Sequence, residues 1–264
     1  MTRSNEDRGD AKTPVTRPMI GPVTGVVAAL PGELGVLARG QRRLGAGLGI
    51  PIFETSLPVG GRILAVAAGV GKVAAATAAA GLIAEGATRL LVVGTCGGLR
   101  AQEPVGALIH ARRAIQWDLA ARNGRELTAD EALMEAWRSI APGERGSILT
   151  ADRPVIRFLD RVRVARAAAK SEVGPVVADM EAAAVAAVAS QAGIAWAALK
   201  VVSDRRPGWM EVSRWAGASM DGFNEALRAH GARPAESVPL LCEALEGQLD
   251  GQARPSGGDL RGEP

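Results

Sequence analysis

The sequence predicts an α/β protein in which helices cover both faces of a sheet. Short apolar stretches of strand length alternate along the chain with alanine-rich stretches of helical length. This alternation is typical of a sheet buried between two layers of helices. A length of 264 residues is enough for one large domain with a sizeable core.

The predicted strands are short apolar runs bounded by turn residues. They cover residues 24–30, 61–68, 89–94, 106–115, 146–150, 175–180 and 195–203. The predicted helices have apolar residues at helical spacing, and they cover residues 32–40, 71–85, 129–140, 154–170, 181–193, 213–231 and 237–249. Gly193 and Gly231 end two of these helices, where a C-terminal cap is expected.

The two ends of the chain differ in composition from the rest. Residues 1–20 and 251–264 are polar and contain proline, so we expect disordered tails around a folded domain spanning residues 21–250. The opening segment lacks the apolar core of a secretory signal, and no apolar run reaches the length of a membrane span. We therefore expect a cytoplasmic protein that is not bound to a membrane.

Composition argues against several kinds of function. The formal charge is +3, but basic and acidic residues are interspersed, which favours solvated helix faces over a nucleic-acid surface. Cys96 and Cys242 form neither a metal-binding spacing nor a disulfide framework, so we expect no metal. With only His110 and His230 as histidines, proton transfer in any catalysis is expected to depend on carboxylates.

The stretch "VVADMEAAAV", residues 176–185, places two carboxylates in an apolar run. Buried carboxylates need compensating partners. The run divides into a strand that ends near Asp179 and a helix that begins near Glu181. We expect Asp179 to cap or support this junction, and Glu181 to face a ligand.

Two more carboxylates follow predicted strands: Glu33 comes after residues 24–30, and Asp204 comes after residues 195–203. Three separate strands thus deliver an acid at their carboxyl ends. Ligands of open α/β sheets bind at that edge, so these acids are expected to converge on one site.

Two glycine-containing stretches are candidates for ligand-binding loops. In "VVGTCGGL" the glycines allow close approach of a ligand to the backbone, although a simple tight turn would use the same residues. A packing role is favoured for Cys96 because no neighbouring base is evident. "AAGVGKVAAAT" is not a phosphate loop, since Val73 follows Lys72, but the amides after Gly71 could face a ligand.

Five segments occur in order at suitable spacings: "VVAALPGEL", "AGVGKVAAATAAAGLI", "VVGTCGGL", "VVADMEAAAVA" and "ALKVVSD". Over about residues 24–230 the chain resembles the purine-nucleoside phosphorylase/nucleosidase superfamily, and within it the methylthioadenosine/S-adenosylhomocysteine nucleosidases. The resemblance implies a single three-layer α/β/α domain around a mixed, partly closed central sheet. It also implies a cofactor-free enzyme that forms a homo-oligomer, commonly a dimer.

The resemblance implies a role for each carboxylate in cleaving an N-glycosidic bond. Asp204 would protonate N7 of the leaving purine, and Glu33 would position and activate the attacking water. Glu181 would bind the ribose hydroxyls while Met180 packs against the sugar. The remaining substrate-binding residues implied by the match are Thr95, Cys96, Gly97, Val155 and Ser203.

Some positions depart from the family pattern and bear on the reaction. Val92 stands where the hexameric phosphorylases carry a phosphate-binding arginine, which favours water over phosphate as the acceptor. Pro154 replaces the aromatic residue that stacks on adenine, and this suggests a different nucleoside, such as futalosine or adenosylhopane. The alternatives are a nucleoside phosphorylase and a non-catalytic nucleoside-binding module of the same fold.

Overall fold

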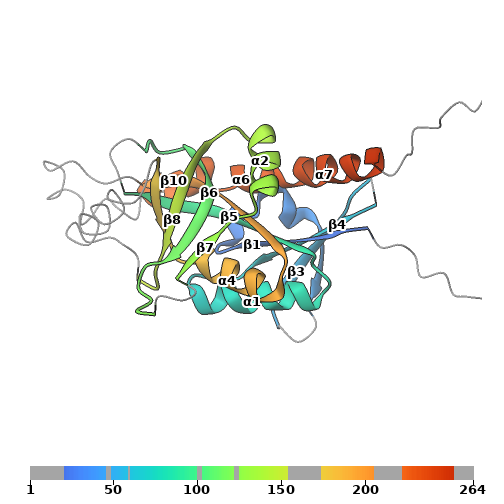
Figure 1. The fold of residues 1–264 in the computed structure, drawn as a ribbon, viewed down its shortest axis with the longest axis horizontal. Helices are drawn as coiled ribbons and strands as arrows, with labels where there is room; N and C mark the ends of the chain where they lie inside the picture. The colour runs from blue at the N-terminus through green and yellow to red at the C-terminus, as the bar shows by residue number, and fades with distance from the viewer. Residues whose placement is uncertain are drawn as a thin grey trace, which may run out of the picture.

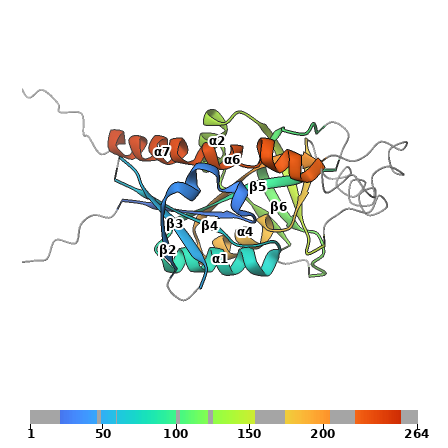
Figure 2. The ribbon, with the colours of Figure 1, turned by 180° about the vertical axis from the view of Figure 1, so that it is seen from behind.

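The computed structural model describes residues 21–45, 49–58, 60–99, 103–121, 125–153, 174–204 and 222–252. They form three layers, with a mixed sheet in the middle and helices on both faces (Figure 1). The predicted fold class is confirmed. Helices α1 (Lys72–Ala84) and α4 (Ala182–Ala192) cover one face. The other face carries α2 (Glu131–Ile140), α6 (Arg233–Glu236) and α7 (Val238–Gln252) (Figure 2).

The described residues form ten strands of one sheet. In chain order they are β1 (Val23–Ala28), β2 (Gln41–Leu44), β3 (Pro51–Ser56), β4 (Arg62–Ala67), β5 (Arg89–Gly98), β6 (Leu108–Gln116), β7 (Glu126–Thr128), β8 (Glu144–Thr150), β9 (Val176–Asp179) and β10 (Ala195–Asp204). Their spatial order is β10-β6-β8-β9-β5-β1-β4-β3-β2, and β7 pairs with β6 outside this path.

The sheet is closed on one side and open on the other. Strand β10 pairs in parallel with β5 and antiparallel with β6, so β5, β10, β6, β8 and β9 form a ring. Strands β1 and β4 continue from β5 in parallel, and the antiparallel β3 and β2 form the open edge. Strand β5 therefore belongs to both parts and lies at the centre of the domain.

Each helical layer buries its own apolar cluster against the sheet. The α1 and α4 layer contributes mainly small residues, such as Ala78, Ala79 and Ala183, which let both helices lie close to the strands. The opposite layer uses larger side chains, including Trp137 of α2 and Leu241 of α7. Fully burying a side chain of leucine size stabilises the fold by about 1.5–3 kcal/mol, so both clusters contribute substantially.

Most predicted elements occur in the structure with shifted ends. Every predicted strand is present, as are the helices predicted at 71–85, 129–140, 181–193 and 237–249. Gly193 has φ +66° and ends α4 as predicted. Residues 222–230 of the helix predicted at 213–231 are helical, and Gly231 follows them. The helix predicted at 154–170 lies outside the described residues.

Some predictions were wrong. The helix predicted at 32–40 is two short 3-10 helices, η1 (Pro31–Glu33) and η2 (Gly35–Arg39), because Gly35 has φ +51° and interrupts the regular helix. Strand β5 does not end at residue 94 in a glycine turn but continues to Gly98. Strands β2, β3 and β7 were not predicted; β2 is mostly exposed and so lacks the apolar pattern of a buried strand.

The predicted tails are untested, since residues 1–20 and 253–264 lie outside the described residues. Helix α7 reaches Gln252, two residues beyond the predicted end of the domain at 250. Within the described ranges, no helix is long and apolar enough to cross a membrane.

Candidate active site

The predicted site residues gather where β1, β5, β9 and β10 end or pass one another. Strands β1, β5 and β10 are parallel, so Glu33 of η1, which follows β1, and Asp204 of β10 lie at the same edge of the sheet. Strand β9 runs antiparallel to β5, with Ala178 opposite Gly97. This pairing brings Asp179 and Glu181 beside the carboxyl end of β5.

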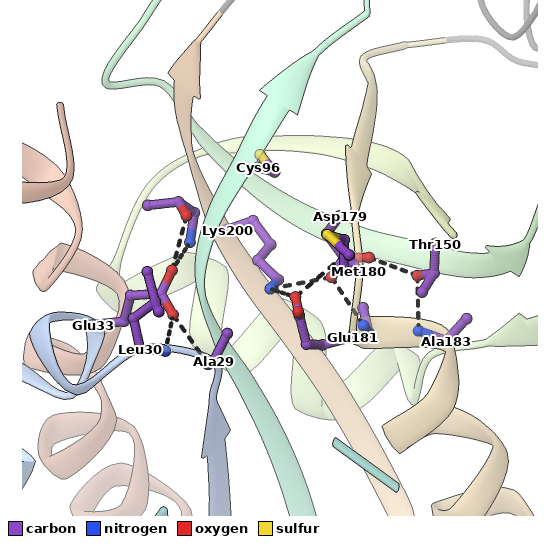
Figure 3. A network of polar contacts seen from close by, with 12 residues as sticks. Ala29, Leu30, Glu33, Cys96, Thr150, Asp179, Met180, Glu181, Ala183 and Lys200 are labelled. Carbon is purple, nitrogen blue, oxygen red and sulfur yellow. Dashed lines mark hydrogen bonds and ion pairs between the residues drawn. The ribbon is translucent and has the colours of Figure 1, made fainter. Parts of the chain in front are cut away.

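The carboxylate of Glu33 is held by four donors from the chain. Its Oε2 accepts the N–H groups of Ala29 and Leu30 at 3.0 and 2.9 Å (Figure 3). Its Oε1 accepts the N–H and the hydroxyl of Thr95 at 2.7 and 2.8 Å. A carboxylate offers about four acceptor positions, so Glu33, which is 2% exposed, has all of them occupied.

Gly94 leaves the space that Glu33 occupies. A Cβ atom at this position would lie 2.7–2.8 Å from all three atoms of the Glu33 carboxyl group. Its φ of +131° is also rarely adopted by residues with side chains. The first glycine of "VVGTCGGL" is therefore required for the placement of Glu33 rather than for a turn.

Asp179 supports the junction between β9 and α4, as predicted. Its Oδ2 accepts the N–H of Ala182 at 2.9 Å, and its Oδ1 accepts the Thr150 hydroxyl at 2.6 Å. The same hydroxyl accepts the N–H of Ala183 at 3.0 Å. These bonds tie the first turn of α4 to the ends of β8 and β9, and they leave Asp179 as a structural carboxylate.

Glu181 is buried but has fewer partners than Glu33. Its Oε1 accepts the N–H of Gly71 at 3.0 Å, and its Oε2 accepts the N–H of Met180 at 3.3 Å. Burial raises the pKa of Glu181, and the neighbouring Asp179 carboxylate adds to this rise, while Lys200 opposes it. Among the described residues, two of the roughly four acceptor positions of Glu181 thus receive no hydrogen bond.

The N-terminus of α1 contacts carboxylates of the chain itself. The Gly71 N–H binds Glu181, and the Lys72 N–H donates to Asp152 at 3.3 Å. The Lys72 ammonium group lies 2.6 Å from Asp118 and 3.4 Å from Asp152. The amides that could face a ligand therefore bind Glu181 and Asp152, and the Lys72 ammonium group binds Asp118.

Lys200 is the residue of the site that the sequence interpretation missed. It lies in the middle of β10, is 1% exposed, and its Nζ is 3.1 Å from Oδ2 of Asp179 and 3.9 Å from Oε2 of Glu181 (Figure 3). Burial acts to lower the pKa of Lys200, but the carboxylates of Asp179, Glu181 and Glu33 outweigh it and raise that pKa. The sequence did contain a sign of this role, since Lys200 is the single charged residue in the apolar run "AWAALKVVS". A buried ammonium group needs acidic partners, which indicates that carboxylates lie nearby.

Asp204 and Ser203 end β10 beside the end of β5. Asp204 is opposite Gly97 across an irregularity in the strand pairing, and it is half-buried. The Ser203 hydroxyl is 3.2 Å from both Oδ1 of Asp204 and the carbonyl oxygen of Cys96, and it can donate to either acceptor. The Ser203 hydroxyl thus lies between the Asp204 carboxylate and the backbone of β5.

The other predicted residues take different places. Cys96 is 3% exposed and packs in the apolar cluster with α1 and α4. Burial raises the pKa of its thiol well above the usual value, so the group stays protonated near neutral pH and suits packing rather than nucleophilic attack. Met180 is half-buried beside Glu181. Val155 and Pro154 lie outside the described residues.

A family model described as "Phosphorylase superfamily" matches residues 23–233. The chain belongs to the phosphorylase superfamily. The match spans β1 to the start of α6 and includes every described element that contributes to the site. A comparison with curated protein sequences finds no match.

Solved structures show that this member of the phosphorylase superfamily shares its fold with nucleosidases. The futalosine hydrolase of Helicobacter pylori is 17% identical, with a TM-score of 0.72 over 84% of this chain and 98% of that chain. The S-adenosylhomocysteine nucleosidase of Streptococcus pyogenes is 22% identical, with a TM-score of 0.71 over 86% and 99%. The 5′-methylthioadenosine/S-adenosylhomocysteine nucleosidase of Neisseria meningitidis is 23% identical, with a TM-score of 0.70 over 84% and 99%.

Proposed function

We propose that the protein is an N-ribosyl hydrolase that cleaves the N-glycosidic bond of a purine nucleoside related to methylthioadenosine or S-adenosylhomocysteine. The observation that carries this proposal is the unequal occupation of the buried carboxylates. Glu33 and Asp179 are held by donors of the chain, whereas Glu181 keeps acceptor positions open. The solved structures with the same fold include two that are named nucleosidases and one named futalosine hydrolase, and these names support the reaction class.

Glu181 would bind the sugar. Its open acceptor positions suit the vicinal hydroxyl groups of a ribose, which are donors at the spacing of one carboxylate. Cleavage of the glycosidic bond leaves positive charge on the sugar ring. A buried carboxylate next to that ring stabilises the charge as it develops, because the surroundings screen it less than water does.

Asp204 would serve the leaving purine. Departure of the base requires a proton at N7, and a carboxylic acid at the end of β10 can deliver it. The Ser203 hydroxyl can donate to Oδ1 of the ionised Asp204 after the transfer. Met180 would pack against the sugar between the two acids, and Val155 would line the base pocket.

Glu33 would position the attacking water and accept its proton. Three of the four donors to Glu33 are backbone amides, which the turn and the strand hold in place. The Thr95 hydroxyl is the one donor that can rotate away. We infer that water binds to Oε1 in the position that this hydroxyl vacates, at the border of the pocket with Cys96 and Gly97.

Electrostatics favours water over phosphate as the acceptor. Glu33, Asp179 and Glu181 are buried acids, and Lys200 is the one buried cation among the described residues. Its ammonium group already pairs with two of these acids. A phosphate dianion would enter a region of like charge, whereas a water molecule would not be repelled.

The test is a panel of methylthioadenosine, adenosylhomocysteine, futalosine, adenosine and inosine, each assayed with and without phosphate by chromatography. Hydrolysis predicts free base and free sugar without phosphate. Sugar 1-phosphate that forms only with phosphate would instead identify a phosphorylase. Tight nucleoside binding in calorimetry without release of base over hours would identify a binding module and overturn the proposal.

The proposal also includes a homo-oligomer, most simply a dimer, and a cytoplasmic location. It includes neither a cofactor nor a nucleic-acid partner. Light scattering of the purified protein measures the oligomeric state. Activity that survives extensive dialysis against a chelator would agree with a cofactor-free reaction.

A further inference from the structure

The buried ammonium group of Lys200 is unusual within a central strand. Its neighbours in the sheet are Gly94 of β5 and Ile109 of β6. Removing an ammonium group from water costs several kcal/mol even after relaxation, so a buried lysine must be compensated by nearby acids. Packing alone would be served better by an apolar residue of the same length.

The two acids that compensate Lys200 differ in how firmly other groups hold them. Asp179 is closer to the ammonium group, at 3.1 Å, and both of its oxygens also accept hydrogen bonds from β8 and α4. Glu181 is 3.9 Å away and, from the part of the chain that the structure describes, otherwise accepts only two backbone hydrogen bonds. Lys200 thus lies between a structural carboxylate and the carboxylate proposed to bind substrate (Figure 3).

The charges around Glu181 make Lys200 important for its ionisation. Burial, Asp179 and Glu33 raise the pKa of Glu181, while Lys200 and the Gly71 N–H lower it. Lys72, on the adjoining turn of α1, directs its ammonium group to Asp118 and Asp152 instead. Among the described residues, Lys200 is therefore the cation that offsets the two neighbouring carboxylates at Glu181.

We propose that Lys200 is a positioning residue that keeps Glu181 ionised and oriented toward the hydroxyl groups of the nucleoside, sharing its charge between Asp179 and Glu181. The predicted effect of Lys200 on turnover rests on the proposed function. The predicted effect of Lys200 on the ionisation of Glu181 does not depend on turnover. An ionised Glu181 accepts hydrogen bonds from both hydroxyl groups, whereas a protonated one has lost an acceptor position.

The test compares Lys200→Met, which removes the charge at similar length, with Lys200→Arg, which keeps it. The first readout is the pH dependence of kcat/KM on the best nucleoside of the panel. We expect Lys200→Met to move the acidic limb upward by at least about one pH unit, the usual effect of losing an opposite charge at this distance. Lys200→Arg is expected to restore the limb toward the wild-type position.

The second readout is the carboxyl ¹³C titration of Glu181 in protein labelled at glutamate, with Glu181→Gln to assign the signal. This measurement succeeds without any turnover, so it separates a failure of the proposed function from a failure of this inference. The expected result is a later titration in Lys200→Met than in wild type. An unchanged titration and an unchanged acidic limb would overturn the inference.

Lys200→Met leaves Asp179 without its cation and can impair folding. The same substitution is therefore also made in an Asp179→Asn background, where no charge of this pair is left unpaired. Asp179→Asn alone is expected to move the Glu181 titration to lower pH, and addition of Lys200→Met to move it back up. A purely structural role for Lys200 predicts no difference between the single and the double variant.

Discussion

Thr95 donates two hydrogen bonds to one oxygen atom of Glu33, from its N–H at 2.7 Å and from its hydroxyl at 2.8 Å. The two residues are far apart in sequence: Glu33 lies in η1 and Thr95 lies in β5. Because the backbone of β5 supplies one of the bonds, the position of Glu33 depends on the path of β5 as much as on its own turn. The site is therefore sensitive to small changes in β5.

Gly94→Ala is expected to displace Glu33. The added methyl group would lie within 2.8 Å of the Glu33 carboxyl atoms, which must move, and a misplacement of about 1 Å at a catalytic group can cost about a hundredfold in rate. The measurement is base release under saturating nucleoside by the folded variant.

The control for Gly94→Ala is Gly86→Ala, which also has a positive φ, of +98°, but no atom within 4 Å of an added Cβ. It is expected to lose about 1–2 kcal/mol of stability through backbone strain and to keep its activity. Equal activity in the two variants would show that the contact between Gly94 and Glu33 is unimportant.

Thr95→Val is expected to lower the free energy of unfolding by about 1–2 kcal/mol, because a hydrogen bond to a buried charge is lost while the shape is kept. Urea denaturation measures this difference. Thr77→Val is the matched control: its exposed hydroxyl bonds to the Val73 carbonyl, and a change within about 0.5 kcal/mol is expected. The same loss in both variants would contradict a special role for Thr95.

Glu181→Gln is expected to stabilise the protein at neutral pH. Burial raises the pKa of Glu181 above its ordinary value of 4.5, so the folded state binds this proton more tightly than the unfolded state does. The carboxylate therefore destabilises the fold as the pH rises from about 4.5 through the raised pKa, and glutamine cannot ionise.

Melting temperatures of wild type and Glu181→Gln at pH 7.5 and pH 4 measure this effect. The variant is expected to melt higher at pH 7.5, with an advantage that shrinks toward pH 4. An advantage that stays constant or grows at pH 4 would show that ionisation of Glu181 is not its cause.

The sequence predicted the buried strands and helices because their apolar patterns are strong. Residues 89–94 and 195–203 consist mainly of apolar residues, and in the structure these strands lie side by side at the centre of the domain. The exposed edge strand β2 has no such pattern, and its pairing with β3 is set by tertiary contacts. Continuation of β5 through its glycines depends on its partners β9 and β10, which local sequence does not reveal.

The candidate site was predictable in part. Asp179 was expected to support its junction, and its bonds to Ala182 and Thr150 confirm this. That Glu33 is saturated by donors depends on the turn at Ala29 and on β5, so composition could not indicate it. Lys200 could have been found by the reasoning applied to Asp179 and Glu181, because all three are charges in apolar runs.

The most direct measurement is phosphate-free base release by wild type and Asp204→Asn, with nucleoside binding measured in parallel by calorimetry. Asparagine keeps the shape of Asp204 but cannot donate the proton that the leaving purine needs, so the rate is expected to fall by about 10²–10⁴-fold while binding changes little. Wild-type release of free base and sugar, lost in Asp204→Asn, is the predicted result. Equal rates in the two proteins, or a wild type that binds nucleosides without releasing base, would contradict it.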